Sequence, residues 1–229
     1  MYLKMNNMAN CFCACSCQSY QLVLHLNRTT RLRDESSLTV KPSAMRVITG
    51  SAKGRTLFGV PGDSTRPITD RVKEALFSIL AAQDAIAGCR FLDLFGGTGS
   101  VGIEALSRGA AAAVFCEKDR RALTILHKNL TLTNLADQAR VVAGDAFAFL
   151  QRTDEASFDL IYIAPPQYRQ WWEKALLLID ERPSLLAANG QIIVQIHPKE
   201  DRALPLRSFG RLEERVYGST LLVFYGHAI

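Results

Sequence analysis

The sequence of 229 residues lacks any long hydrophobic run. No apolar stretch approaches the roughly 18 residues that a membrane-spanning helix needs, so we expect a soluble protein with no membrane partner. The composition is not biased toward any residue type, because apolar residues make up 48% and charged residues 21% of the chain. These proportions exclude a disordered or collagen-like protein. The sequence has no internal repeat, and its length predicts one domain of ordinary size with an extension.

A strong charge excess is absent from most of the chain. The net charge is +5, but residues 1–44 carry five basic and two acidic residues, a net charge of +3. The remaining 185 residues carry 22 basic and 20 acidic residues, a net charge of only +2. Net charge alone therefore does not identify the main part of the chain as a nucleic-acid binder.

Cysteine is scarce outside one short run. Four of the six cysteines alternate in the segment CFCACSC, at Cys11, Cys13, Cys15 and Cys17. This run lacks the two-residue gap of a zinc knuckle and has no histidine nearby until His25, so we predict no metal site. Cys89 and Cys116 lie in apolar, strand-like stretches and are predicted to be small buried hydrophobic residues.

Residues 1–44 show no clear amphipathic periodicity. Two interpretations are open: an upstream start codon that adds a non-functional leader, or an organelle transit peptide. We predict that this segment is largely disordered and dispensable, and that the folded domain spans residues 45–229. The expected location is cytoplasmic, or plastid if the segment is a transit peptide.

From Met45 onward, strand and helix patterns alternate. The runs 45–50 and 55–60 predict a β-hairpin, and Thr69 caps a helix that ends near Ala82. Further strands are predicted at 89–94, 113–117, 140–144, 158–163 and 191–196, with helices at 100–108, 119–132, 145–152 and 170–188. Near-continuous apolar strands are typical of a parallel sheet buried on both faces. Residues 211–226 predict an antiparallel hairpin at its edge, which gives an α/β fold.

A glycine-rich turn follows the first strand of the predicted sheet. Gly97, Gly99 and Gly102 match G-x-G-x-x-G, and Glu117 ends the next strand, where an acid can accept hydrogen bonds from a ribose. This pattern fits either a dinucleotide or S-adenosylmethionine. Asp93, in the mouth of the loop, would repel a pyrophosphate and suits the cationic side of S-adenosylmethionine.

Two other strand ends carry candidate residues. Asp145 follows the third strand and can accept a hydrogen bond from an adenine amino group, with Phe147 packing on the ring; the alternative role for Asp145 is an ordinary helix N-cap. The fourth strand ends in IYIAPPQY (161–168). Its two prolines lack N–H groups and leave carbonyl groups free to accept hydrogen bonds, and Tyr168 can stack on a flat base.

Taken together, these motifs resemble the bacterial 16S ribosomal RNA guanine-N2 methyltransferases, the group that modifies guanine 966. The similarity is carried by MRVITGSAKGR (45–55), STRPITDRVKEALFSIL (64–80), LDLFGGTGSVGIEALSRGA (92–110), CEKD (116–119) and the proline motif. The resemblance implies a Rossmann-like, seven-stranded S-adenosylmethionine-dependent methyltransferase fold with an N-terminal β-hairpin and an antiparallel C-terminal hairpin. It also implies methyl transfer to the exocyclic N2 of a guanine, in small-subunit ribosomal RNA or a partly assembled small subunit. Nothing in the sequence demands more than a monomer.

The resemblance also implies which residues form the site. The cofactor-binding residues are Asp93, Phe95, Gly97, Gly99, Glu117, Lys118, Asp145 and Ala146, and the catalytic residues are Ala164, Pro165, Pro166, Gln167 and Tyr168. The chain departs from the family's D-P-P or N-P-P motif, because Ala164 replaces the acid or amide and Gln167 moves the aromatic residue back by one place. We predict that backbone carbonyls and the Gln167 amide oxygen replace the missing acceptor, with Tyr168 stacking on the guanine.

RNA contact is predicted for the hairpin and loop, residues 45–69. Residues 46–73 contain six basic and two acidic residues, a cluster suited to phosphate contact. The predicted RNA-binding residues are Arg46, Lys53, Arg55, Arg66 and Arg71, although Arg71 and Lys73 also suit a solvated helix face. Two other functions remain open: a nicotinamide-dependent Rossmann oxidoreductase, and a catalytically impaired RNA-binding or ribosome-assembly module, which Ala164 motivates.

Overall fold

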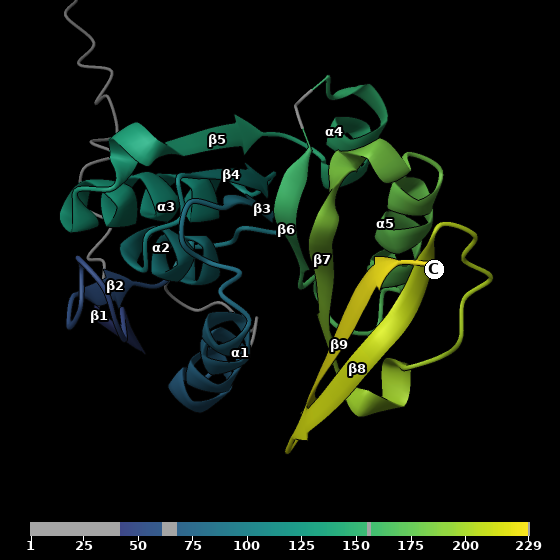
Figure 1. Ribbon diagram of the computed structural model, residues 1–229. Helices are drawn as coiled ribbons and strands as arrows, with labels where there is room; N and C mark the ends of the chain where they lie inside the picture. Colours follow the sequence, from purple (N-terminus) through teal and green to yellow (C-terminus); the bar gives the residue numbers. More distant parts are fainter. Residues whose placement is uncertain (1–41, 61–67, 155–156, 229) are drawn as a thin grey trace, which may run out of the picture. The chain divides into compact units, whose positions relative to one another are not determined.

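The computed structural model describes residues 42–60, 68–154 and 157–228 (Figure 1). The cysteine run at 11–17, Arg66 and nearly all of the predicted leader lie outside these residues. Within the described part of the chain, no helix is long and apolar enough to cross a membrane.

The centre of the fold is a seven-stranded sheet with the order β5-β4-β3-β6-β7-β9-β8. Five strands run parallel, namely β3 (Arg90–Asp93), β4 (Ala112–Glu117), β5 (Ala139–Ala143), β6 (Phe158–Ile163) and β7 (Leu186–Ile196). The hairpin of β8 (Phe209–Tyr217) and β9 (Thr220–His227) adds two antiparallel strands at the edge, with β9 next to β7. This arrangement confirms the predicted parallel sheet with an antiparallel C-terminal hairpin.

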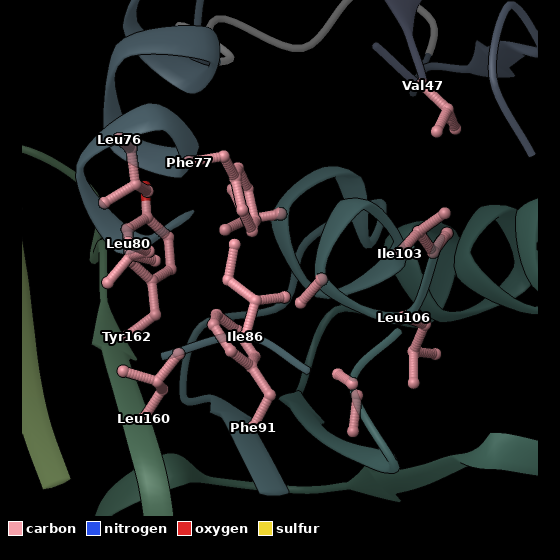
Figure 2. Close-up of a cluster of buried hydrophobic side chains, with 14 of the residues drawn as sticks. Val47, Leu76, Phe77, Leu80, Ile86, Phe91, Ile103, Leu106, Leu160 and Tyr162 are labelled. Atoms are coloured by element: carbon pink, nitrogen blue, oxygen red, sulfur yellow. The ribbon is translucent and has the colours of Figure 1, made fainter. Parts of the chain in front are cut away.

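Helices cover both faces of the sheet and bury two separate apolar cores (Figure 1). The helices α1 (Asp70–Ala82), α2 (Ser100–Ser107) and α3 (Arg120–Thr133) bury one face, and α4 (Ala146–Arg152) and α5 (Trp171–Asp180) bury the other. Figure 2 shows the first core, where Phe77 of α1, Ile103 of α2 and Phe91 of β3 gather over the sheet. Burial on both faces explains why these strands are apolar at nearly every position.

One predicted helix is too long. Instead of running over 170–188, α5 ends at Asp180 and a 3₁₀ turn covers Pro183–Leu185. Pro183 lacks the N–H group that a continuing helix needs. β7 then begins at Leu186, which pairs with Phe158 of β6.

The N-terminal hairpin forms from β1 (Pro42–Arg46) and β2 (Thr56–Phe58), so its strands differ from the predicted runs 45–50 and 55–60. The pairing continues only through Val47, whose N–H donates to the Arg55 carbonyl oxygen. The rest of the segment docks on α2, where the Ser51 N–H donates to the Ser107 carbonyl oxygen at 2.8 Å. At Gly50, φ is +89° and a Cβ atom would lie 1.7 Å from the Ser107 carbonyl oxygen. Only glycine fits such a close approach of two backbones.

Cys89 and Cys116 are buried, as the sequence predicts, and neither forms a disulfide. Burial raises the pKa of each thiol to about 12. Both side chains therefore act as small apolar residues of the core.

Candidate cofactor and substrate site

A cavity of about 690 Å³ opens where the parallel strands end. Ten of the thirteen predicted cofactor and catalytic residues line it, namely Phe95, Gly97, Glu117, Lys118, Asp145, Ala146, Ala164, Pro165, Pro166 and Gln167. Asp93, Gly99 and Tyr168 are not among the lining residues. The fold thus brings motifs from four strand ends into one site, as expected for an open α/β sheet.

The glycines of the loop after β3 have different tasks. A Cβ atom at Gly99 would lie 2.3 Å from Leu126 Cδ1, and one at Gly102 would lie 2.3 Å from Phe115 Cε1. These two positions therefore allow the loop and α2 to pack closely on their neighbours. At Gly97 the nearest heavy atom would be 4.0 Å away, so a side chain there would take up cavity space that a ligand can use.

Asp93 lies beneath this loop and is 2% exposed. Its Oδ2 accepts a hydrogen bond from the Gly102 N–H, at 3.2 Å, in the first turn of α2. Its Oδ1 is buried and has no hydrogen-bond partner among the described residues. Burial raises the pKa of Asp93 to about 7. The Gly102 and Phe95 N–H groups partly offset this rise, and the nearby charge of Glu117 adds to it. An acceptor therefore remains available at the base of the site.

Glu117 holds the loop from the neighbouring strand. Its Oε2 accepts from the Gly97 N–H at 2.8 Å, and its Oε1 accepts from the N–H groups of Lys118 and Asp119 at 2.8 and 2.7 Å. The same half-buried carboxylate lines the cavity. Glu117 thus fixes the shape of the turn and presents negative charge to a ligand.

Asp145 is the N-cap of α4, and its Oδ1 accepts from the N–H groups of Phe147 and Ala148 at 3.0 and 3.1 Å. Its Oδ2 has no hydrogen-bond partner among the described residues. The two roles considered for Asp145 are therefore compatible, because capping uses one oxygen and leaves the other for a ligand.

An aromatic cluster at the cavity includes a residue that the sequence analysis missed. Trp171 stacks on Phe95 with ring centroids 6.3 Å apart and meets Phe147 edge-on at 6.0 Å. Lys118 Nζ lies 4.3 Å from the centroid of the Trp171 ring. The available signal was the tryptophan pair near the start of the helix predicted over 170–188, a segment interpreted only as helix. Gln195, Ile196 and Thr220 also line the cavity and were not predicted.

The proline segment borders the cavity except at its end. Ala164 and Pro165 are half-buried, and Pro166 and Gln167 are exposed. Tyr168 is 66% exposed, has φ of +60°, and its N–H donates to Glu200 Oε2 at 2.8 Å. Its ring lies beside that of His197, with centroids 5.8 Å apart. Stacking of Tyr168 on a base thus stays a prediction.

Among the predicted RNA-binding residues, Lys53, Arg55 and Arg71 are exposed, and Arg46 forms an exposed ion pair with Asp70 at 3.1 Å. Lys73, counted in the same basic cluster, is fully buried. The expectation of a solvated Lys73 is therefore wrong. Its ammonium group is held inside the protein by the Arg46 carbonyl oxygen at 2.6 Å, where it reaches no phosphate.

The family model described as "Conserved hypothetical protein 95" matches residues 45–226. The chain belongs to this family. Ribosomal RNA small subunit methyltransferase D of Escherichia coli (strain K12) is 36% identical over 165 residues, which cover 70% of this chain and 78% of that protein. The protein of the same name from Haemophilus influenzae is 35% identical over 176 residues, covering 76% and 89% of the two chains.

A solved structure that is similar to this chain agrees with the fold. The structure of yhhF from Escherichia coli is 36% identical, covers 80% of this chain and 97% of its own, and gives a TM-score of 0.70. The resemblance inferred from the sequence motifs is therefore confirmed, and so is the methyltransferase fold. The family match starts at the same residue, Met45, as the sequence motifs.

Proposed function

We propose that this chain is an S-adenosylmethionine-dependent methyltransferase that modifies the exocyclic N2 of a guanine in small-subunit ribosomal RNA. The names of the family relatives support methylation of small-subunit ribosomal RNA. The guanine, the N2 position and action as a monomer follow from the resemblance of the motifs. A site with space for a nucleoside cofactor and an open edge for a base supports the same reaction.

The observation that supports this proposal most strongly is that N–H groups of the glycine-rich loop and of α2 already donate to carboxylates of the chain itself. A dinucleotide site uses the free N–H groups of such a loop and of the following helix to bind a pyrophosphate. Here the Gly97 N–H already donates to Glu117, and the Gly102 N–H already donates to Asp93. Both N–H groups therefore have carboxylate partners and are not free to bind a pyrophosphate, which argues against a nicotinamide cofactor.

The same residues fit an adenosyl cofactor that carries positive charge. Glu117 Oε2, which accepts one hydrogen bond within the chain, would accept a second from a ribose hydroxyl group. Asp145 Oδ2 would accept one from the adenine amino group. The buried Oδ1 of Asp93 lacks a partner among the described residues and would accept from the ammonium group of the methionine part. Phe147 and Trp171 would supply apolar contact for the ring system.

The task of the chain's own residues is orientation. When bound, S-adenosylmethionine supplies a methyl group on a sulfonium, a leaving group that departs as a neutral thioether. A carbonyl group of Ala164 or Pro165 would accept one hydrogen of the target amine, because Pro165 and Pro166 bring no competing N–H groups. Alignment of two reactants is itself a large source of rate. The base must leave its stack to reach this site.

We also propose that residues 45–229, together with residues 42–44 of β1, form the methyltransferase domain, and that the segment before Pro42 is dispensable. β1 begins at Pro42, so a deletion should stop before this strand. A variant that lacks residues 1–38 is expected to bind cofactor and transfer methyl groups at the rate of the full chain.

The test has two parts. Calorimetric titration with S-adenosylhomocysteine and with NAD should show binding of the first alone. Methyl transfer is then measured on naked 16S ribosomal RNA and on partly assembled small subunits, and the product is located by mass spectrometry of nucleosides. Binding of NAD alone would support the oxidoreductase. Cofactor binding without transfer to either substrate would identify a catalytically impaired RNA-binding module, as Ala164 suggests.

A further inference from the structure

Ala164 and Gln195 lie side by side where two parallel strands end. The register of β6 and β7 pairs Tyr162 with Ile193 and Ile163 with Val194, so the next step of the register places Ala164 opposite Gln195. Both residues line the cavity. Residues directly opposite each other on neighbouring strands point to the same side of a sheet. The Gln195 side chain therefore emerges next to the methyl group of Ala164.

The amide of Gln195 is already fixed in place. The Tyr162 hydroxyl donates to Gln195 Oε1 at 2.6 Å. Tyr162 is 2% exposed and packs in the core shown in Figure 2, and burial raises its pKa well above the ordinary value. The phenol thus keeps its proton and remains a donor. An amide oxygen accepts up to two hydrogen bonds, so Oε1 can accept a second from a ligand.

Gln167, the acceptor expected from the sequence, has a different setting. It is exposed, and its side chain has no hydrogen bond among the described residues. Binding a base through Gln167 would require ordering of a free side chain, which costs conformational entropy. Gln195 is half-buried and already held by Tyr162. Binding of a base to Gln195 therefore does not require the ordering of a free side chain.

We propose that Gln195 Oε1 accepts one hydrogen of the exocyclic amine of the target base, with Tyr162 as the positioning residue that aims this oxygen. This inference rests on the proposed function. In the transfer step, the amine lone pair forms the new nitrogen–carbon bond while the carbon–sulfur bond breaks and its electron pair stays on sulfur. The amine then loses one proton to solvent water. Gln195 gains and loses no proton, and its role is to orient the lone pair toward the methyl group.

The test is single-turnover methyl transfer to small-subunit ribosomal RNA by purified variants of the full chain. Gln195→Leu removes the acceptor and should lower the rate about ten- to hundredfold, with unchanged affinity for S-adenosylhomocysteine. Gln195→Glu keeps an acceptor and should restore most of the rate. Gln191→Leu is the matched control, because Gln191 lies four residues before Gln195, opposite Leu160 of β6, and outside the cavity lining, where it donates to Gln83 at 3.1 Å; its rate should equal that of the wild type.

Tyr162→Phe tests the positioning role separately. Loss of the hydroxyl should lower the rate about three- to tenfold in the wild-type background and should have no further effect in Gln195→Leu. A structural role alone would lower the rate in both backgrounds. If Gln195→Leu does not fold, Gln195→Met replaces it, and the effect of Tyr162→Phe is compared in the wild type and in Gln195→Met.

The outcomes separate the two proposals. A wild-type rate in Gln195→Leu overturns the inference and leaves the proposed function intact. Loss of transfer in Gln167→Leu, with a normal rate in Gln195→Leu, assigns the acceptor to the proline segment instead. A wild-type protein that binds S-adenosylhomocysteine and methylates neither naked nor assembled RNA overturns the methyl-transfer proposal, and this inference with it.

Discussion

Lys73 Nζ lies 3.6 Å from Glu104 Oε2, and neither side chain is more than 1% exposed. The same carboxylate accepts from the N–H groups of Ile48 and Thr49 at 2.7 and 3.0 Å and pairs with Arg108 at 2.8 Å. One buried charge thus joins the N-terminal hairpin, α1 and α2. Each buried ion in such a group depends on its partners to offset the loss of its hydration.

Glu104→Gln should therefore destabilise the protein strongly. The change leaves Lys73 as a buried cation that lacks its anion, and removal of one partner from a buried pair costs about 3–5 kcal/mol. The free energy of unfolding measured in urea gives this value. Glu74→Gln, at an exposed position of α1, is the control and should change stability by less than about 0.5 kcal/mol. Equal stability of both variants would show that the buried pair contributes nothing to the fold.

Because of Asp93, the stability of the protein and its affinity for the cofactor should change with pH in opposite directions. Burial raises its pKa to about 7, whereas an unfolded aspartate has a pKa of about 3.9. Between these values the folded chain binds a proton that the unfolded chain does not. The ligand-free protein should therefore lose stability as the pH rises from about 4 to 7. Binding of the ammonium group that S-adenosylmethionine and S-adenosylhomocysteine share needs the carboxylate, so the affinity for either ligand should rise through pH 7.

Thermal unfolding from pH 5 to 8, with and without S-adenosylhomocysteine, measures both effects. Asp93→Asn removes the titrating group, so its ligand-free profile should fall less steeply with pH than that of the wild type. The variant should also bind S-adenosylhomocysteine about ten- to hundredfold more weakly at pH 8, the loss expected for a charged hydrogen bond. If the melting temperatures of the wild type and of Asp93→Asn change with pH in the same way, Asp93 does not titrate between pH 5 and 8, and the prediction is wrong.

Trp171 should report cofactor binding. Its ring lies at the cavity against Phe95, Phe147 and Lys118, so a ligand beside it changes its surroundings. Titration with S-adenosylhomocysteine should change the tryptophan fluorescence of the wild type and leave that of Trp171→Phe unchanged. The chain's other tryptophan, Trp172, is 1% exposed and serves as the internal control. Trp171→Ala should weaken binding about three- to tenfold; a fluorescence change that persists in Trp171→Phe would contradict this placement.

The sequence predicted the elements whose patterns are local. Apolar strands separated by helices specified the parallel sheet, and the spacing of Gly97 and Glu117 placed both at the cavity. The sequence did not reveal contacts set by strand register and packing. Gln195 reaches the cavity because β7 lies beside β6. Trp171 lies at the cavity because its ring stacks on Phe95, in the loop after β3. Lys73 resembled any surface lysine on a helix, since its partner Glu104 is 31 residues away.

The hairpin should bind RNA through Lys53 and Arg55, which are exposed and lie where the hairpin docks on α2. Each phosphate contact that is removed should weaken binding and reduce the salt dependence of the affinity, by about 0.7–0.9 in the slope of log K against log salt concentration. The double variant Lys53→Ala, Arg55→Ala should therefore show a slope lower by about 1.4–1.8, with unchanged affinity for S-adenosylhomocysteine. Electrophoretic mobility shift with a small-subunit ribosomal RNA fragment at several salt concentrations measures this slope.

Arg152→Ala is the control for that experiment, because Arg152 is exposed at the end of α4, on the other face of the sheet from the helices that hold the hairpin. A general effect of net charge would lower affinity in the control as well, about half as much as in the double variant, which loses two charges. A specific hairpin contact leaves the control at the wild-type value. The slope also separates the loss of a phosphate contact from a change in folding, because a phosphate contact releases counterions and a change in folding does not. An unchanged slope in the double variant would assign RNA binding to a different surface.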